Sequence, residues 1–365
     1  MKLEQIRTEL KNTFLERDEV VDGLLAALLA KESVLLLGPP GTAKSALAEA
    51  VCTVVEDATY FRWLLTKYTT PEEIFGPVDI RALKQGSFRR NTAGKLPEAE
   101  VVFLDEVFKA SSSILNILLT AINEKMFYND GTAMEIPMQL LVGASNELPE
   151  NEAELAALYD RFLLRYTVGY LTSDDARLRL LGDDKIGNYT GPQLTHQELE
   201  QLQDTVDNTP VPNDILELAE SIRRELQKEG ITGSDRRWRK VIRLARAFAV
   251  LHGEAKVSAD SLAEAITHSL WQVPDQQAKV AQVVWEVANP VKQQVMEVLD
   301  AAEELMATLP TEDSELLQCG AEINSKLRDM VKQLQTLGDS PVVKEAVEKV
   351  EGYREQVKKR LVELL

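Results

Sequence analysis

Apolar residues follow two different periods along this chain, and the change of period separates its regions. Near the N-terminus they recur at three- and four-residue spacing, which predicts an amphipathic helix through Ile6, Leu10 and Phe14 and a second helix over 19–30. Short, continuous apolar runs come next, as expected of strands that are buried on both faces of a parallel sheet. The runs are SVLLLG (33–38), YFRWLL (60–65), VVFLD (101–105), LLVGAS (140–145) and FLLRYTV (162–168). Residues 1–172 are therefore predicted to form an α/β core.

Helical patterns replace the strand signals beyond about residue 174. Glycine and proline breaks separate three predicted helices, at 213–229, 235–252 and 258–271, which indicate an all-α unit over 173–275. A third region, 276–365, carries three more amphipathic segments. Thr311 and Ser340, each beside a proline, are predicted as helix N-caps between these segments. We expect the third region to fold as an antiparallel helical bundle.

Composition narrows the classes of protein to which the chain can belong. With 59 acidic and 41 basic side chains in 365 residues, the net charge is −18, which argues against a general nucleic-acid-binding protein. No apolar run reaches the roughly 20 residues that a membrane span needs, and the N-terminus lacks the pattern of a secretory signal. Cys52 and Cys319 are expected to be reduced thiols. We predict a cytoplasmic protein without membrane insertion.

The stretch GPPGTAKS (38–45) follows a predicted strand and opens a predicted helix, which is the context that a phosphate loop requires. Successive backbone N–H groups in such a loop bind anions, and the helix N-terminus adds its positive dipole end. Lys44 is expected to reach the β- and γ-phosphates of ATP, and Ser45 to coordinate Mg²⁺. The predicted nucleotide-binding residues are Gly38, Pro39, Pro40, Gly41, Thr42, Ala43, Lys44, Ser45 and Ala46.

Ala43 departs from the common form of this loop, in which a glycine precedes the lysine. A methyl group is tolerated there if the residue has already entered right-handed helical geometry, where alanine is the best helix former. We therefore expect Ala43 to be helical and Gly41 to supply the conformational freedom. The alternative is a strand–turn–helix junction that binds no nucleotide.

The stretch VVFLDE (101–106) supplies a complementary motif. A strand that ends in Asp places its carboxylate at the carboxyl edge of a parallel sheet, where the ligands of open α/β sheets bind. Asp105 is expected to coordinate Mg²⁺ directly or through water, and Glu106 to act as the general base for the attacking water. The pairing of this motif with the phosphate loop, with strands between them, predicts ATP hydrolysis.

Together with these two motifs, several segments make the chain resemble the AAA+ ATPases and, within them, the MoxR family in its RavA-like branch. The segments are TPEEIFGPVDI (70–80), GKLPEAEVVFLDEVFKASSSILNILLTAINEKMF (94–127), LLVGASNELPE (140–150), LYDRFLLR (158–165) and SDRRWRKVIRL (234–244). The resemblance covers about residues 1–275, and AKS in place of GKS or GKT is a habit of that family. The fold it implies is a P-loop parallel sheet sandwiched by helices and followed by an all-α lid, with the helical bundle at the C-terminal end.

The resemblance also implies roles for three residues outside the two motifs. Asn146 is similar to the sensor 1 residue, which contacts the γ-phosphate or orients water. Arg161 resembles the arginine finger, which reaches the nucleotide of a neighbouring subunit, and Arg236 resembles sensor 2, which couples the lid to the phosphates. An arginine suits both roles because its planar, permanently charged fork bridges phosphate oxygens. Arg165 and Arg237 are the competing candidates for these two roles.

Two segments are similar to inserts that the family places near the central pore of a ring. The first insert, 78–96, has strand-like arms around a Lys-Gln-Gly-Ser turn, and the second, 125–137, has β-rich arms around an Asp-Gly pair, a strong hairpin signal. Positive charge is concentrated on the first insert. That charge is consistent either with a solvated face or with an acidic partner peptide.

The function implied is Mg²⁺-dependent ATP hydrolysis by a homo-oligomeric, hexameric ring that remodels or matures a protein or metalloprotein complex. The resemblance implies a partner with a von Willebrand A (VWA) domain, while the protein client stays open. Three alternatives remain: a DNA-acting AAA+ motor, a motor subunit like those of metal chelatases, and an ATP-gated scaffold with low turnover. Each would use the same phosphate loop, so the motifs alone do not choose among them.

Overall fold

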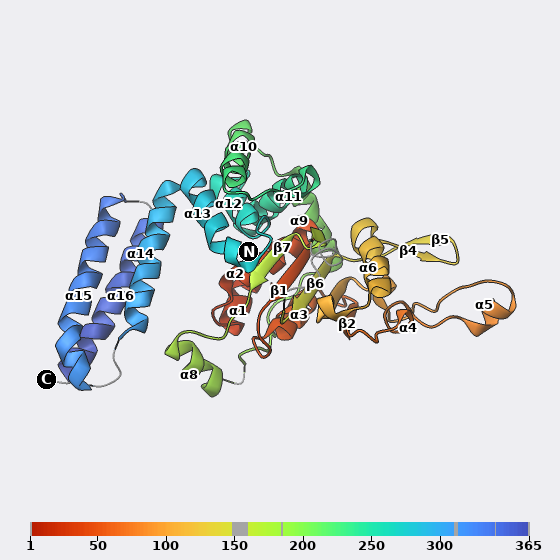
Figure 1. Ribbon diagram of the computed structural model, residues 1–365, viewed down its shortest axis with the longest axis horizontal. Coiled ribbons are helices and arrows are strands. Elements are labelled where there is room, and N and C mark those ends of the chain that lie inside the picture. The colour runs from red at the N-terminus through yellow and green to blue at the C-terminus, as the bar shows by residue number, and fades with distance from the viewer. Residues whose placement is uncertain (1, 148–159, 184, 310–312, 340, 364–365) are drawn as a thin grey trace. The chain divides into compact units, whose positions relative to one another are not determined.

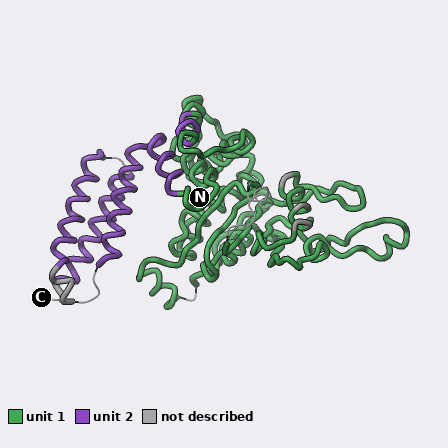
Figure 2. The backbone as a smooth tube through the Cα atoms, viewed as in Figure 1, with its two compact units in different colours: residues 1–220, 227–277 green, residues 221–226, 278–365 purple. Residues whose placement is uncertain are grey.

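The computed structural model describes residues 2–147, 160–183, 185–309, 313–339 and 341–363. The chain forms two compact units, coloured separately in Figure 2. Unit 1 comprises residues 1–220 and 227–277, and unit 2 comprises residues 221–226 and 278–365. Among the helices of the described residues, none is both long enough and apolar enough to cross a membrane.

A parallel sheet of five strands, flanked by helices, forms the centre of unit 1 (Figure 1). All five strands predicted from the apolar runs are present, and they pair in the order β2-β3-β6-β1-β7. Their bounds are Ser33–Leu37 (β1), Tyr60–Leu64 (β2), Val101–Asp105 (β3), Leu140–Ser145 (β6) and Leu164–Thr167 (β7). Every residue of β1 and β6 is buried, which explains why these two segments are apolar without alternation.

The register of the strands decides which residues meet at each edge of the sheet. Leu37 at the end of β1 lies opposite Ser145 of β6 and Thr167 of β7. The Gly38 amide donates to the Ser145 carbonyl at 3.1 Å. The segments that follow β1, β3, β6 and β7 therefore share the carboxyl edge. At the amino edge, the Leu163 amide donates to the Ser33 carbonyl at 3.1 Å.

Helices of unit 1 cover the sheet and form the region that follows it. The predicted N-terminal helices are confirmed as α1 and α2, and the three predicted later helices as α10, α11 and α12. Helices α8 and α9 precede those three, in the part of the chain where the helical patterns begin. The bounds are Lys2–Thr13 (α1), Asp18–Ala30 (α2), Lys44–Thr53 (α3), Pro71–Phe75 (α4), Ser112–Glu124 (α6), Asp174–Gly182 (α8), His196–Asn208 (α9), Asn213–Lys228 (α10), Asp235–Leu251 (α11) and Ala259–Thr267 (α12).

The two inserts lie side by side and are joined by hydrogen bonds. The second is the predicted hairpin, with strands β4 (Met126–Asn129) and β5 (Thr132–Glu135). The prediction of strand-like arms in the first insert is wrong: Ile80–Lys84 form a short helix, α5, because the Asp79 carboxylate caps its N-terminus. The buried Asn129 side chain accepts from the Arg90 amide at 2.7 Å and donates to the Arg90 carbonyl at 3.1 Å.

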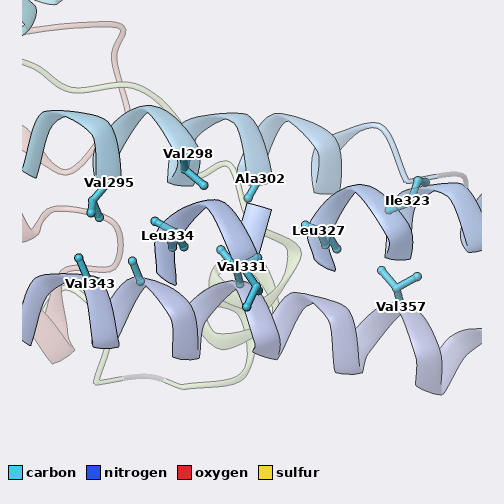
Figure 3. Packing of buried hydrophobic residues seen from close by; sticks show 11 residues of the cluster. Val295, Val298, Ala302, Ile323, Leu327, Val331, Leu334, Val343 and Val357 are labelled. Atoms are coloured by element: carbon cyan, nitrogen blue, oxygen red, sulfur yellow. The ribbon is translucent and has the colours of Figure 1, made fainter. Parts of the chain in front are cut away.

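Unit 2 contains the predicted C-terminal bundle, in which three long helices bury an apolar cluster (Figure 3). Helix α13 spans Gln277–Ala288, and the bundle helices are α14 (Pro290–Ala307), α15 (Asp313–Thr336) and α16 (Pro341–Glu363). Val298, Leu327 and Val350 are among the buried residues, as their spacing predicted. Val291 was expected in the same stripe but is 38% exposed. The proposed caps Thr311 and Ser340 lie outside the described residues.

Candidate nucleotide site

The phosphate loop leaves β1 through three residues with positive φ, namely Gly38 (153°), Gly41 (81°) and Ala43 (68°). At Gly38, a Cβ atom would lie 2.1 Å from the Val168 carbonyl oxygen, so the close approach of β7 requires glycine. Gly41 faces open space, and its requirement for glycine is conformational. The loop thus presents backbone groups in a tight turn ahead of α3.

Ala43 does not have the conformation that we expected from the sequence. It has φ 68° and ψ 15°, which is left-handed, and it is the N-cap of α3, with its carbonyl accepting from the Leu47 amide at 2.9 Å. The expectation of right-handed helical geometry is therefore wrong. The glycine of the common pattern matches the left-handed geometry at this position, and alanine adopts it at a cost.

Lys44 is a buried cation whose contacts are neutral oxygen atoms. Its side chain is 6% exposed, and Nζ donates to the carbonyls of Gly38 (2.7 Å) and Pro39 (2.8 Å) and to Asn146 Oδ1 (3.1 Å). Among the described residues, no carboxylate oxygen lies within ion-pair distance of this ammonium. Burial lowers the pKa of Lys44, although the nearby Asp105 and Glu106 oppose the shift. A buried ammonium held by neutral dipoles fits a site for a phosphate group.

Three polar side chains from different strand ends form one chain of contacts. Asn146, directly after β6, accepts from Lys44 and donates to Glu106 Oε1 at 2.5 Å. Glu106 follows β3, is 9% exposed, and has a left-handed backbone (φ 51°). Asp105, the last residue of β3, accepts from the Glu106 amide at 3.0 Å. The structure thus gathers Lys44, Asp105, Glu106 and Asn146 at the carboxyl edge of the sheet.

The remaining residues predicted for nucleotide binding lie in the same loop and in the first turn of α3. Thr42 is buried and donates to the Pro39 carbonyl at 3.0 Å, while Pro40 is exposed. Ser45 and Ala46 are partly exposed in α3, directly after Lys44. Ser45 and Asp105 are the residues here whose oxygens suit a hard cation such as Mg²⁺.

Two contacts at this edge were not anticipated from the sequence. Lys109 Nζ lies 3.2 Å from Glu106 Oε2, an ion pair whose signal in the sequence is a lysine three residues after the glutamate. The Tyr170 hydroxyl lies 3.4 Å from the Pro40 carbonyl, so the segment after β7 reaches the phosphate loop. Nothing in the spacing of Tyr170 indicated this contact.

Arg161 and Arg236 lie at the opposite edge of the sheet. Both line one shallow hollow with Leu163 and Lys240. Leu163 is bonded to Ser33 at the start of β1, and Lys240 pairs with Glu32 at 2.6 Å. The five residues of β1 separate this edge from the phosphate loop, a rise of about 13 Å. Neither arginine is therefore placed to reach Lys44 of its own chain.

The competing arginines are both buried. Arg165 in β7 is 2% exposed and donates to the Trp271 carbonyl. Arg237 is 6% exposed and binds backbone carbonyls on both sides of the hollow. A buried side chain with such partners cannot extend to a phosphate on another chain, so burial argues against both competitors.

Comparison with protein families agrees with this architecture. A profile for the MoxR domain in the MoxR-vWA-beta-propeller ternary systems matches residues 1–204. A profile for an AAA lid domain matches residues 214–284. The two matches together span the α/β core and the helices that follow it.

Individual relatives match over different lengths. Two uncharacterised proteins of Methanocaldococcus jannaschii are 38% and 36% identical; the first match covers 91% of this chain and 86% of that protein, and the second 97% and 98%. Chaperone MoxR1 of Mycobacterium tuberculosis is 30% identical over 48% of this chain and 46% of its own length. A crystal structure from Cytophaga hutchinsonii, described as a possible ATPase, has 18% identity and a TM-score of 0.62 over 78% of this chain and 93% of its own. This last likeness shows the fold alone.

Proposed function

Because this chain belongs to the MoxR family of AAA+ ATPases, we propose that it hydrolyses ATP with Mg²⁺ at sites shared between copies of the chain in a ring. The observation that carries the proposal is the contact chain from Lys44 through Asn146 to Glu106. It joins a phosphate-binding cation, a polar sensor and a carboxylate base within one hydrogen-bonded unit.

Each residue of the site contributes a distinct step. The loop from Gly38 to Ser45 holds the phosphates through backbone amides, and Lys44 exchanges its carbonyl partners for phosphate oxygens. Bound Mg²⁺ would neutralise phosphate charge, and Ser45 and Asp105 would hold it. Glu106 accepts a proton from the attacking water, and the Asn146 amide keeps that carboxylate oriented toward the phosphate loop.

Substituting Glu106 tests the chemistry. Glu106→Gln keeps an acceptor for Asn146 but removes the base, so we expect ATP binding to persist and turnover to fall by roughly 10²–10⁴. Lys44→Ala should abolish binding. The matched control is Glu124→Gln, an exposed glutamate at the end of α6, which should turn over normally. A Glu106→Gln enzyme with the wild-type rate would refute the assignment.

The placement of Arg161 and Arg236 at the amino edge supports a site shared in trans. Among the described residues, the Arg161 guanidinium contacts the partly exposed Asp160 carboxylate at 3.4 Å, and Arg236 is exposed. We propose that both arginines reach the phosphates bound by a neighbouring subunit, where their charge stabilises the transition state.

Mixing subunits tests the shared site. Arg161→Ala and Lys44→Ala should each be inactive alone. Rings that contain both should recover part of the hydrolysis, because some interfaces then pair an intact phosphate loop with an intact Arg161. Recovery should appear only at concentrations that permit assembly. No recovery in rings shown to be mixed would remove Arg161 from this role. Sedimentation with ATP tests the proposed hexamer.

For the cellular role, we propose remodelling of a protein complex together with a VWA-domain partner, in the cytoplasm. The description of the matched MoxR profile, which names vWA systems, supports that partner, and placement in the RavA-like branch is part of the same proposal. The inserts offer a surface for an acidic client segment, because Phe88 and Tyr128 are 54% and 56% exposed beside the basic Arg89. ATPase stimulation by a purified VWA-domain protein, absent with a VWA protein from an unrelated system, tests the pairing.

A further inference from the structure

Arg237 connects the helix that carries Arg236 to the segment that carries Arg161. It lies in the first turn of α11, and its guanidinium reaches two separate stretches of backbone. Nε donates to the Ser269 carbonyl at 2.6 Å, after α12. Nη1 donates to the carbonyl and the carboxylate of Asp160, both at 3.0 Å. Nη2 donates to the carbonyls of Phe162 and Leu163, both at 2.9 Å. We refer to Arg237 with these four residues as the Arg237 clamp.

The chemistry of the clamp requires arginine. The carbonyls of Asp160, Phe162 and Leu163 stand before β7 begins, and a single planar fork with five donors meets them all. A lysine ammonium has three donors at one point and cannot span acceptors on both sides. The side chain is 7% exposed, so its charge depends on the Asp160 carboxylate and on these carbonyl dipoles.

The two proposed trans arginines are the immediate chain neighbours of the clamp. Arg161 stands between Asp160 and Phe162, whose carbonyls are both held. Arg236 precedes Arg237 in α11. Arg161, Arg236 and Arg237 line the same hollow with Lys240. Any shift of α11 relative to the segment before β7 would therefore change the separation of Arg161 and Arg236.

We propose that Arg237 is a positioning residue for hydrolysis in trans: it fixes α11 to residues 160–163, so that Arg161 and Arg236 meet one neighbouring phosphate group together. This inference rests on the proposed shared site. It assigns Arg237 no contact with nucleotide, and it places the effect of the clamp entirely on the face opposite its own phosphate loop.

The conservative variant Arg237→Lys tests the proposal. We expect the affinity for ATP, measured with a fluorescent analogue, to stay within about threefold of wild type, since the carboxyl edge is untouched. The kcat should fall by about 10- to 100-fold with KM unchanged, because small misplacements of catalytic groups have effects of that size. Arg165→Lys is the matched control, a second buried arginine that binds a carbonyl outside the clamp, and it should keep its kcat. A wild-type kcat for Arg237→Lys overturns the proposal.

Mixing separates positioning from a general loss of structure. An Arg237→Lys subunit should recover hydrolysis when combined with Lys44→Ala subunits, because its own phosphate loop is intact and the partner supplies a sound arginine pair. A subunit that is merely misfolded fails on both faces and is not rescued, so the absence of recovery in mixed rings overturns the proposal.

Two further measurements keep the result decisive. If Arg237→Lys does not fold, Asp160→Ala removes the side-chain acceptor of the clamp and leaves its carbonyl bonds, and kcat should fall about three- to tenfold; an unchanged kcat counts against the clamp. Arg161→Ala, measured in parallel, separates the two proposals. Full activity of Arg161→Ala refutes the shared site itself, whereas an inactive Arg161→Ala beside a fully active Arg237→Lys refutes the positioning role alone.

Discussion

Replacing Ala43 by glycine should stabilise the protein, although the same change in a helix is destabilising. An alanine in left-handed geometry is disfavoured by roughly 1–2 kcal/mol, and Ala43 has φ 68°. Glycine relieves this strain but loses more conformational entropy on folding, about 0.5–1 kcal/mol. The net effect of Ala43→Gly is therefore a gain of roughly 0.5–1 kcal/mol in the free energy of unfolding.

Ala46 provides a control three residues away in the same loop–helix junction. It lies inside α3, so Ala46→Gly should lower the free energy of unfolding by about 1 kcal/mol, the difference in helix propensity. The two variants should thus differ by roughly 1.5–2 kcal/mol and in sign. Urea unfolding followed by tryptophan fluorescence measures both, and binding of an ATP analogue confirms that the loop still functions in Ala43→Gly.

The comparison of signs decides the conformation of Ala43. If Ala43→Gly and Ala46→Gly both lose about 1 kcal/mol, Ala43 is right-handed in solution, as the sequence pattern favours. A gain for Ala43→Gly with a loss for Ala46→Gly supports the left-handed N-cap. The result bears on function too, because the left-handed residue gives the loop its turn ahead of Lys44.

Two further predictions concern residues outside the nucleotide site. Burial lowers the pKa of Lys125 from 10.5 to about 8 while Nζ donates to the carbonyls of Lys31 and Met138. The unfolded chain then binds more protons between these values, so the free energy of unfolding should rise from pH 8 to pH 10.5 relative to Lys125→Met, by the order of 1–2 kcal/mol; a constant difference across this range would contradict it. Asn129→Ala removes both bonds to Arg90, so hydrogen exchange of the Arg90 amide should accelerate by about tenfold while amides of β1 keep their rates. Unchanged exchange at Arg90 would show that the inserts are not joined by Asn129.

The burial of Arg237 has a signal in the periodicity of its helix. The buried residues of α11 include Arg237, Val241, Leu244 and Phe248, which follow helical spacing. Arg237 therefore falls on the apolar stripe of its helix, whereas Arg236 does not. This periodicity distinguishes a structural arginine from an exposed one by sequence position alone.

The amino-acid sequence by itself determined the features that depend on local interactions. Continuous apolar runs specified five buried strands, because a strand covered on both faces excludes polar side chains. Glycine and proline punctuation set the phosphate loop, and the Asp-Gly pair set the β4–β5 turn. Lys44, Asp105 and Glu106 follow directly from such local motifs.

Only the tertiary structure decided the features that depend on contacts between distant segments. The left-handed state of Ala43 arises where β1 meets α3 beneath the β7 segment, and propensity alone favoured the opposite state. The joining of Asn146 to Glu106 needs β3 and β6 as neighbours, which is a matter of strand order. The separation of Arg161 and Arg236 from Lys44 follows from the parallel register, since residues before and after a strand meet opposite edges of the sheet. Strand order and register are set by the packing of the whole core, so no single stretch of sequence contains them.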